Sequence, residues 1–215
     1  NQKGGVGKTT TTINVARYLA EAGKRVLLVD LDPQGNASSG LGVHVRNLEK
    51  NLYHAMTLGL PTVEIILDIG IENLYLIPAA QDLAGAEIEM VHISDREFRL
   101  YHAIRQVRSE FDYILIDSPP SLGLLTVNGL VASDGVIVPV QTEYYALEGL
   151  SQLLGTIELV RERLQPNLQI YGALLTLFDR RNRLARQVVE EVRRHFPGPV
   201  FDSVIPRSVR LAEAP

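Results

Sequence analysis

The chain lacks cysteine, long apolar runs and a basic-then-apolar segment at its start. Its 215 residues therefore hold no disulfide, no thiolate metal site and no cysteine-held iron–sulfur cluster. No apolar run approaches the ~18 residues that a membrane-spanning helix needs, and the opening residues do not resemble a secretory signal. We expect a cytoplasmic protein.

The chain also lacks a general excess of basic charge. Its formal net charge of −4 argues against a protein that is basic all over, but the charge is uneven. Residues 176–215 hold eight arginines against five acidic residues, a balance of +3, whereas the first 175 residues have a balance of −7. Such asymmetry predicts either a local anionic partner or ordinary solvated helix faces, and charge alone does not decide between them.

The apolar pattern predicts one large α/β domain. Continuous apolar runs typical of buried parallel strands occupy residues 26–32, 73–78, 112–117, 135–140, 170–177 and 199–205. Helical spacing predicts helices over residues 9–22, 51–57, 63–68, 84–91, 94–110, 122–132, 141–164 and 184–196, and residues 38–42 are predicted as a loop. This alternation predicts a single doubly wound, mainly parallel sheet flanked by helices.

A glycine-rich stretch at the start has the composition of a phosphate-binding loop. Lys3-Gly4-Gly5-Val6-Gly7-Lys8-Thr9-Thr10 leads directly into the first predicted helix. Glycines allow backbone N–H groups to face an anion, and the helix N-terminus adds positive potential. We expect Lys8 to reach the β- and γ-phosphates of a nucleotide and the Thr9 hydroxyl to bind Mg²⁺. The alternative is a glycine-rich turn with two solvated lysines.

Two predicted strands end in aspartates at the edge where open α/β sheets bind ligands. The first strand places Asp30 and Asp32 on opposite faces, and a turn follows Asp32. The strand over residues 112–117 ends in Asp117, as in a Walker B segment, whose carboxylate holds Mg²⁺ through its water shell. Turn-capping carboxylates are the structural alternative for both.

These motifs resemble those of the ParA/MinD group of P-loop ATPases. The loop departs from the ordinary G-x-x-x-x-G-K-[ST] pattern by having Gln2 in place of the first glycine and a second lysine, Lys3. Asp-Leu-Asp-Pro-Gln-Gly-Asn (30–36), Ile-Asp-Ser-Pro-Pro-Ser (116–121), Gln-Thr-Glu-Tyr-Tyr-Ala-Leu-Glu-Gly (141–149) and Val-Ile-Pro-Arg (204–207) are similar to segments of chromosomal ParA/Soj partition ATPases. The likeness runs over the whole chain.

The resemblance implies a slow, partner-stimulated ATPase with ATP and Mg²⁺ as cofactors. Two ATP-bound copies would form a sandwich dimer in which Lys3 crosses to the partner's phosphates, somewhat as an arginine finger does. Asp32 would position the attacking water. The dimer would bind double-stranded DNA without sequence preference, placing the protein at the nucleoid, and a ParB/Spo0J-type partner would stimulate hydrolysis and release it.

The family also implies two further sets of contacts. Its DNA-contacting arginines fall where this chain has Arg181 and Arg210, inside the basic region counted above. Its adenine site lies after the last strand, near Pro206 and Ser208, although family members commonly carry asparagine at the position of Ser208.

Three alternatives remain. A MinD-like cell-division ATPase at the membrane would carry a C-terminal amphipathic helix, which we do not find in these residues, and the arginine-rich region favours partition. A metabolite-activating ligase or kinase on the same scaffold would respond to a small molecule instead of DNA. A nucleotide-binding module that does not hydrolyse ATP would not need Lys8, Thr9, Asp32 and Asp117 together.

A phosphate loop should follow a strand, and none precedes residue 3. We therefore expect the native protein to have an N-terminal strand and a C-terminal segment beyond residues 1–215, and these residues alone to fold poorly.

Overall fold

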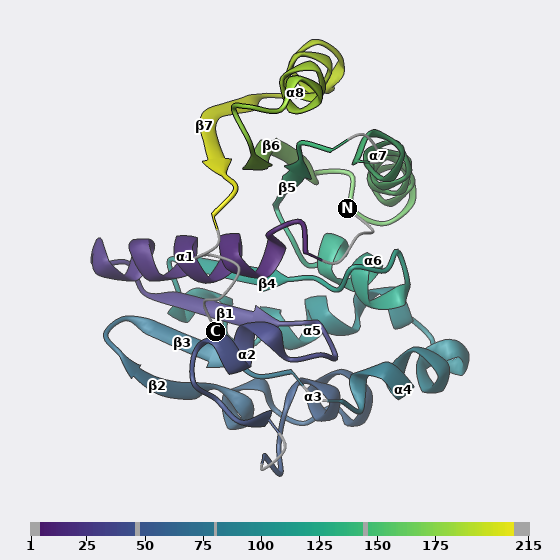
Figure 1. Ribbon diagram of the computed structural model, residues 1–215. Helices are drawn as coiled ribbons and strands as arrows, with labels where there is room; N and C mark the ends of the chain where they lie inside the picture. The colour runs from purple at the N-terminus through teal and green to yellow at the C-terminus, as the bar shows by residue number, and fades with distance from the viewer. Residues whose placement is uncertain (1–4, 46–47, 80, 144–145, 209–215) are drawn as a thin grey trace. The chain divides into compact units, whose positions relative to one another are not determined.

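The computed structural model of the protein describes residues 5–45, 48–79, 81–143 and 146–208. It divides into two compact units, one of Thr9–Ala132 and the other of Asn1–Lys8 with Ser133–Pro215. We describe each unit by itself (Figure 1). Both contain parallel strands flanked by helices, as predicted. No helix among the described residues combines the length and apolar content needed to cross a membrane.

The Thr9–Ala132 unit is built on a four-stranded sheet in the order β2-β3-β1-β4. Strand β1 (Val26–Asp30) pairs in parallel with β3 (Leu74–Ile77) and with β4 (Tyr113–Asp117), while β2 (Leu67–Ile71) is antiparallel to β3. The register places Asp30 opposite Asp117. The ends of the two apolar runs are thus brought together at the carboxyl edge of the sheet.

Both faces of this sheet are buried. Alternate β1 residues, Leu27 and Val29, enter one apolar cluster, and Val26 and Leu28 enter another. Helix α1 (Lys8–Glu21) contributes Ala16 and Ala20 to the second cluster. The first cluster takes buried side chains from α3 (Leu52–Leu58), α4 (Leu83–Glu89), α5 (Arg99–Arg105) and α6 (Leu124–Val131). Burial on both faces explains why β1 is apolar throughout.

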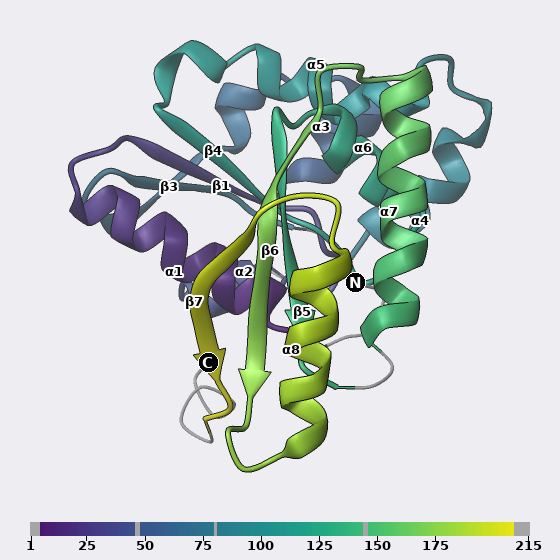
Figure 2. The same cartoon turned by 90° about the horizontal axis from the view of Figure 1, so that it is seen from above.

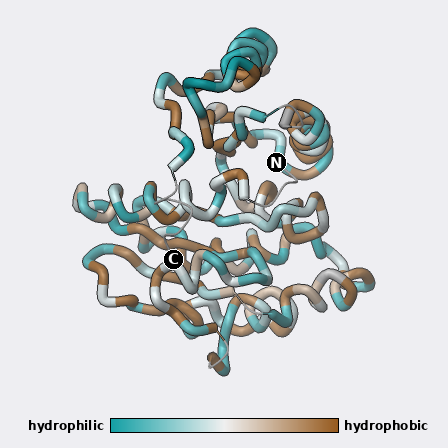
Figure 3. Tube along the Cα trace, viewed as in Figure 1, coloured by the Kyte–Doolittle hydropathy of each residue, from teal (hydrophilic) through white to brown (hydrophobic). Residues whose placement is uncertain are grey.

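The second unit contains the parallel sheet β5-β6-β7. Its strands are β5 (Gly135–Gln141), β6 (Gln169–Phe178) and β7 (Val200–Pro206), with β6 in the middle (Figure 2). Helix α7 (Ala146–Arg163) buries residues at helical spacing, Leu150, Leu153, Ile157 and Val160. Helix α8 (Arg183–His195) is mostly hydrophilic along its length (Figure 3), and its buried residues are Ala185, Val188 and Val192.

Several local predictions were wrong. The loop predicted at residues 38–42 contains part of helix α2 (Asn36–Gly40). The helix predicted over residues 63–68 is a 3₁₀ turn (Thr62–Ile65) followed by β2. Leu67, Ile69 and Ile71 are partly buried and alternate with exposed residues, so a period of two was present in the sequence.

The predicted helix over residues 94–110 is broken into three pieces. A 3₁₀ turn (Arg96–Phe98) precedes α5, and a second one (Arg108–Glu110) follows it. Asp95 precedes the first turn with a left-handed φ of 56°, and its side chain makes no capping hydrogen bond. Leu100, Ile104 and Val107 are buried.

Among the described residues the strands pair as β2-β3-β1-β4 in one unit and β5-β6-β7 in the other, mainly in parallel and flanked by helices, as the α/β prediction requires. The single-domain organisation and the additional N-terminal strand and C-terminal segment stay predictions.

Candidate functional site

The described part of the glycine-rich loop uses two glycines at backbone angles that favour glycine. Gly5 and Gly7 have φ values of 80° and 87°, in the left-handed region, and helix α1 begins at Lys8. An added Cβ would meet nothing within 4 Å at Gly5 and only ordinary contacts at Gly7, so glycine is required for backbone conformation and not for space. Lys3 and Gly4 lie outside the described residues.

The hydroxyl of Thr9 lies next to the carboxylate of Asp117, the other residue that the sequence motifs assign to Mg²⁺. Thr9 Oγ1 donates a hydrogen bond to Asp117 Oδ2 at 2.7 Å, across 108 residues of sequence. Thr12, one turn further along α1, donates to Asp117 Oδ1 at 3.3 Å. Asp117 is 1% exposed. A hydroxyl that donates its hydrogen to a carboxylate keeps its lone pairs for another partner, such as a cation.

Asp32 lies just beyond β1 and is almost buried. Its Oδ1 accepts a hydrogen bond from the Gln34 N–H at 3.0 Å, and its carbonyl oxygen accepts from the Gly35 N–H at 2.9 Å. Within the ranges that the structure describes, no group donates to Asp32 Oδ2. The turn therefore fixes the carboxylate through one oxygen and leaves the other for a ligand or a water molecule.

Asp30 is a buried residue to which sequence reasoning gave no role. Its Oδ2 accepts hydrogen bonds from the Ser38 N–H at 2.7 Å and the Ser38 hydroxyl at 2.6 Å, and its Oδ1 accepts from the Asp32 N–H at 3.3 Å. Ser38 Oγ in turn accepts from the Ala79 N–H at 3.2 Å. Asp30 thus joins the end of β1 to the turn that carries Asp32, to α2 and to the segment after β3.

Burial raises the pKa of the Asp30 carboxyl to about 6, although the hydrogen bonds from Ser38 lower it. The carboxyl is fully buried, and the causes of the shift that lie among the described residues are burial, the hydrogen bonds from Ser38 and Asp32, and the charge of Asp32. The Asp-x-Asp spacing draws attention to Asp30 in the sequence. The sequence does not reveal which N–H groups will donate hydrogen bonds to it in the folded protein.

The donors in this unit fit magnesium. Thr9 and Asp117 offer only oxygen atoms, which Mg²⁺ prefers, and Mg²⁺ sites generally use one or two protein ligands together with water and phosphate oxygens. Among the described residues there is no cluster of three or more His, Asp or Glu side chains that could hold a metal by itself. The residues therefore suit a cation that arrives with a phosphate ligand.

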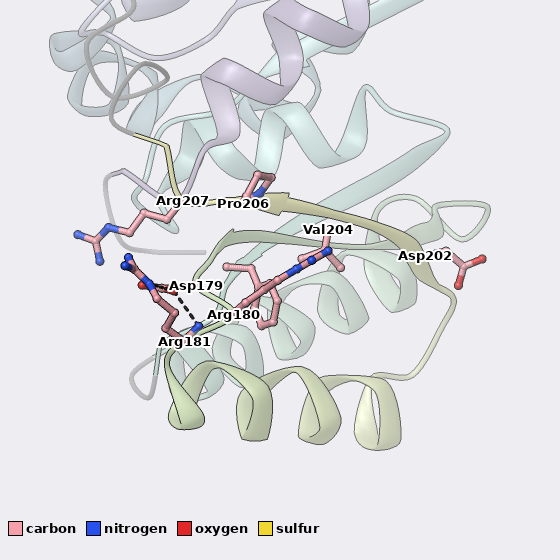
Figure 4. A pocket seen from close by; sticks show the side chains of 8 residues that line it. Asp179, Arg180, Arg181, Asp202, Val204, Pro206 and Arg207 are labelled. Atoms are coloured by element: carbon pink, nitrogen blue, oxygen red, sulfur yellow. Dashed lines mark hydrogen bonds and ion pairs between the residues drawn. The ribbon is translucent and has the colours of Figure 1, made fainter.

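The second unit contains an open pocket of about 910 Å³ at the carboxyl ends of β6 and β7 (Figure 4). It is lined by Phe178, Asp179, Arg180, Arg181, Asp202, Val204, Pro206 and Arg207. The Arg181 backbone N–H donates to Asp179 at 2.9 Å and its guanidinium does so at 3.3 Å. These bonds, with a smaller contribution from the charge of Arg207, lower the pKa of the Asp179 carboxyl.

The pocket contains part of the sequence-predicted contacts. Arg181 and Pro206 line it, and the Arg181 side chain is 92% exposed. Ser208 lies two residues beyond the end of β7 and is not among the residues that line the pocket. Arg207, which sequence reasoning did not select, lies 4.0 Å from Glu143 and lines the pocket beside the arginines of the preceding loop. Arg210 lies outside the described residues.

Together, the fold and these residues define the class: an α/β protein of the P-loop type, with a phosphate-loop threonine beside a strand-end aspartate. A protein-family model described as "AAA domain" matches residues 1–170. The chromosome partitioning protein ParA of Myxococcus xanthus is 55% identical over 215 residues, covering all of this chain and 76% of that protein. The sporulation initiation inhibitor protein Soj of Bacillus subtilis is 56% identical, covering 85% of that protein.

This chain belongs to the ParA/Soj family of chromosome-partitioning P-loop ATPases. Among solved structures it is similar to cobyrinic acid a,c-diamide synthase from Mycobacterium smegmatis with bound ADP and magnesium. That structure superposes with a TM-score of 0.91 at 41% identity and covers 97% of this chain and 84% of its own. The names of these relatives describe two different activities on one scaffold.

Proposed function

We propose that the protein is an ATP-dependent DNA-partitioning ATPase that hydrolyses ATP to ADP and phosphate. The observation that carries the proposal is the hydrogen bond from Thr9 to Asp117, because it places a phosphate-loop hydroxyl on a strand-end carboxylate. ParA and Soj relatives at 55–56% identity over the whole chain support partition as the process. The ADP and magnesium bound by the M. smegmatis protein support ATP and Mg²⁺ as ligands.

The residues of this chain have separate tasks in the proposed reaction. The backbone N–H groups of Gly5–Thr10 and the Lys8 ammonium bind and orient the phosphates of ATP. Thr9 and, through water, Asp117 would hold Mg²⁺, which when bound would supply positive charge to the phosphate oxygens. Asp32 orients the attacking water with the carboxylate oxygen that its turn leaves unused. Positioning and charge account for most of the catalysis.

Lys3 is the residue that we propose to link ATP binding to dimerisation. A second ammonium supplied by the partner subunit would offset the γ-phosphate charge, so two ATP-bound copies would associate through their nucleotides. This role comes from the resemblance to the ParA family. It predicts that Lys3→Ala binds ATP but forms no ATP-dependent dimer, and a normal dimer measured by light scattering with ATP would remove the role.

DNA binding is assigned to Arg181 and Arg210, and the adenine site to the neighbourhood of Pro206 and Ser208. The high exposure of Arg181 and the arginines around it support a contact with phosphates, which requires no reading of bases. Arg181→Ala should weaken DNA binding equally for all sequences and reduce its dependence on salt. Arg17→Ala, which removes an exposed arginine on α1, is the matched control.

The test of hydrolysis is the Asp32→Ala variant. We expect it to bind Mg·ATP with nearly wild-type affinity, to lose ATP hydrolysis, and to remain on DNA as an ATP-bound dimer. Asp68→Ala removes an exposed carboxylate from β2 and should leave hydrolysis unchanged. Undiminished hydrolysis by Asp32→Ala would end the catalytic assignment. A ParB-type partner should raise the slow rate and release the protein from DNA.

The M. smegmatis structures favour one alternative, a ligase that acts on a metabolite. That function predicts ATP turnover stimulated by cobyrinic acid and unaffected by DNA, whereas partition predicts the reverse. A MinD-like role at the membrane predicts ATP-dependent co-sedimentation with anionic liposomes instead of DNA.

A further inference from the structure

A buried threonine on β6 is hydrogen-bonded to the phosphate loop. Thr176 Oγ1 donates to the carbonyl oxygen of Val6 at 2.9 Å, although 170 residues separate the two in sequence. Both residues belong to the same unit and both are buried, with Thr176 2% and Val6 0% exposed. The bond is therefore shielded from water, which would otherwise compete for the carbonyl.

This bond sets the orientation of the peptide that joins Val6 to Gly7. In a planar trans peptide the carbonyl and the following N–H point in opposite directions. With the Val6 carbonyl held toward β6, the Gly7 N–H must point away from β6. A phosphate loop works only when such N–H groups face the anion, because a carbonyl in the same place would repel it.

The residue after this peptide makes the lock necessary. Gly7 has a φ of 87° and glycine adopts positive and negative φ with similar ease, so rotating the peptide costs little in backbone energy. Rotation of the peptide would break the hydrogen bond between Thr176 and the buried Val6 carbonyl. The free energy lost with that bond therefore disfavours the rotation. Thr176 also packs beside Gly7, since a Cβ there would lie 3.8 Å from Thr176 Cγ2.

Thr176 is itself fixed by the neighbouring strand end. The Thr142 N–H, just beyond β5, donates to the Thr176 carbonyl at 3.1 Å, and the Thr142 hydroxyl lies 3.3 Å from the Leu177 carbonyl. Leu177 has a φ of 53°, which is uncommon for a residue other than glycine and shows that the surroundings dictate this backbone. The donor that orients the loop thus stands on a rigid support.

We propose that Thr176 is a positioning residue that locks the Val6–Gly7 peptide in the orientation that binds phosphate. The inference rests on the proposed function, because it concerns how the loop receives a nucleotide. Thr176 touches no reacting atom; it acts through the loop backbone. Sequence reasoning placed residue 176 only within a buried strand.

The test compares Thr176→Val, which removes the hydroxyl at nearly constant shape, with Thr176→Ser, which retains it. Affinity for Mg·ADP is measured by calorimetry after thermal melting shows that each variant is folded. Thr176→Val should bind about ten-fold more weakly, the effect of one lost hydrogen bond to a buried acceptor. Thr176→Ser should bind within about two-fold of the wild type, because the donor remains.

Thr62→Val is the matched control. It removes a hydroxyl that is also buried and also donates to a backbone carbonyl, that of Ala103 at 2.8 Å, but that has no part in orienting the phosphate loop. If Thr176 has only a structural role, both valine variants should lower the melting temperature while their Mg·ADP affinities stay at the wild-type value. That result would overturn the proposal. Failure of the wild type to bind Mg·ADP would instead remove the proposed function.

A second measurement needs no variant. In the nucleotide-free wild type, the amide signal of Gly7 in a ¹⁵N NMR spectrum should be single and sharp, as expected for one peptide orientation. Exchange broadening of that signal, with NMR relaxation dispersion that disappears when Mg·ADP is added, would show that the peptide changes orientation in the free protein. That result would overturn the proposal even if Thr176→Val does not fold.

Discussion

Replacing Asp30 with asparagine should change how the stability of the protein depends on pH. The carboxyl is fully buried, and its pKa is raised from the ordinary 3.8 to about 6, chiefly by desolvation. The folded protein therefore binds a proton at Asp30 more tightly than the unfolded chain does. Because proton binding and folding are linked, ionisation of Asp30 lowers the free energy of unfolding as the pH rises from about 4 to about 6. Above that range the full loss of stability is present.

The expected size follows from the two pKa values. They differ by about two pH units, and each unit corresponds to about 1.4 kcal/mol, so the ionised carboxylate costs about 3 kcal/mol at pH 7. Asparagine carries no charge but can accept through only one of its two terminal atoms. Losing one of the hydrogen bonds from Ser38 or Asp32 should offset about 1 kcal/mol of that gain.

Urea unfolding of the wild type and Asp30→Asn at pH 4 and pH 7 measures this directly. Between pH 4 and pH 7 the free energy of unfolding of Asp30→Asn should rise by about 2 kcal/mol relative to that of the wild type, because part of the cost of about 3 kcal/mol is already present at pH 4. Groups that titrate equally in both proteins cancel in this comparison. Ser38→Ala gives a second test: it removes a hydrogen bond that lowers the pKa of Asp30, so the loss of stability should extend to higher pH. Parallel pH profiles for wild type and Asp30→Asn would show that the Asp30 carboxyl has the same pKa in the folded and unfolded states.

Two further predictions concern side chains that organise the first unit. Asn128 is fully buried, accepts from the Leu100 N–H at 3.0 Å and donates to the Arg96 and Leu124 carbonyls. Asn128→Ala should therefore lower the free energy of unfolding, measured by urea titration, by about 2–3 kcal/mol. A change of less than about 0.5 kcal/mol would contradict that role. Thr9→Val should reduce, by about ten-fold or more, the factor by which Mg²⁺ raises the affinity for ATP. Thr12→Val removes the longer hydrogen bond to Asp117 and should reduce that factor much less. Equal reductions, measured by calorimetry, would show that Thr9 has no special part in holding the metal.

The features that the sequence predicted well are those that local chemistry determines. Apolar runs located the strands because burial on both faces requires them, and the glycine–lysine–threonine pattern located the phosphate loop because few residues allow its backbone. The hydrogen bond between Thr9 and Asp117 joins two residues that the motifs assign to one Mg²⁺ site, and that the site holds Mg²⁺ stays a prediction.

The features that the sequence did not predict depend on distant side chains. Helix α2 forms over a Ser-Ser-Gly segment because the Asp30 carboxylate accepts the Ser38 N–H near the start of that helix, where Gly35 offers no capping side chain. Helix α5 begins later than predicted, and the Asn128 amide accepts its Leu100 N–H. The bond from Thr176 to Val6 likewise joins residues that no local pattern connects.

We propose that this chain couples the turnover of ATP to the binding of DNA. The most direct measurement is the rate of phosphate release from ATP by the full-length protein, with and without non-specific double-stranded DNA and with Asp32→Ala as the control. We predict slow, magnesium-dependent release that DNA changes and that Asp32→Ala abolishes. Release that is unaffected by DNA, or that persists in Asp32→Ala, would contradict the account.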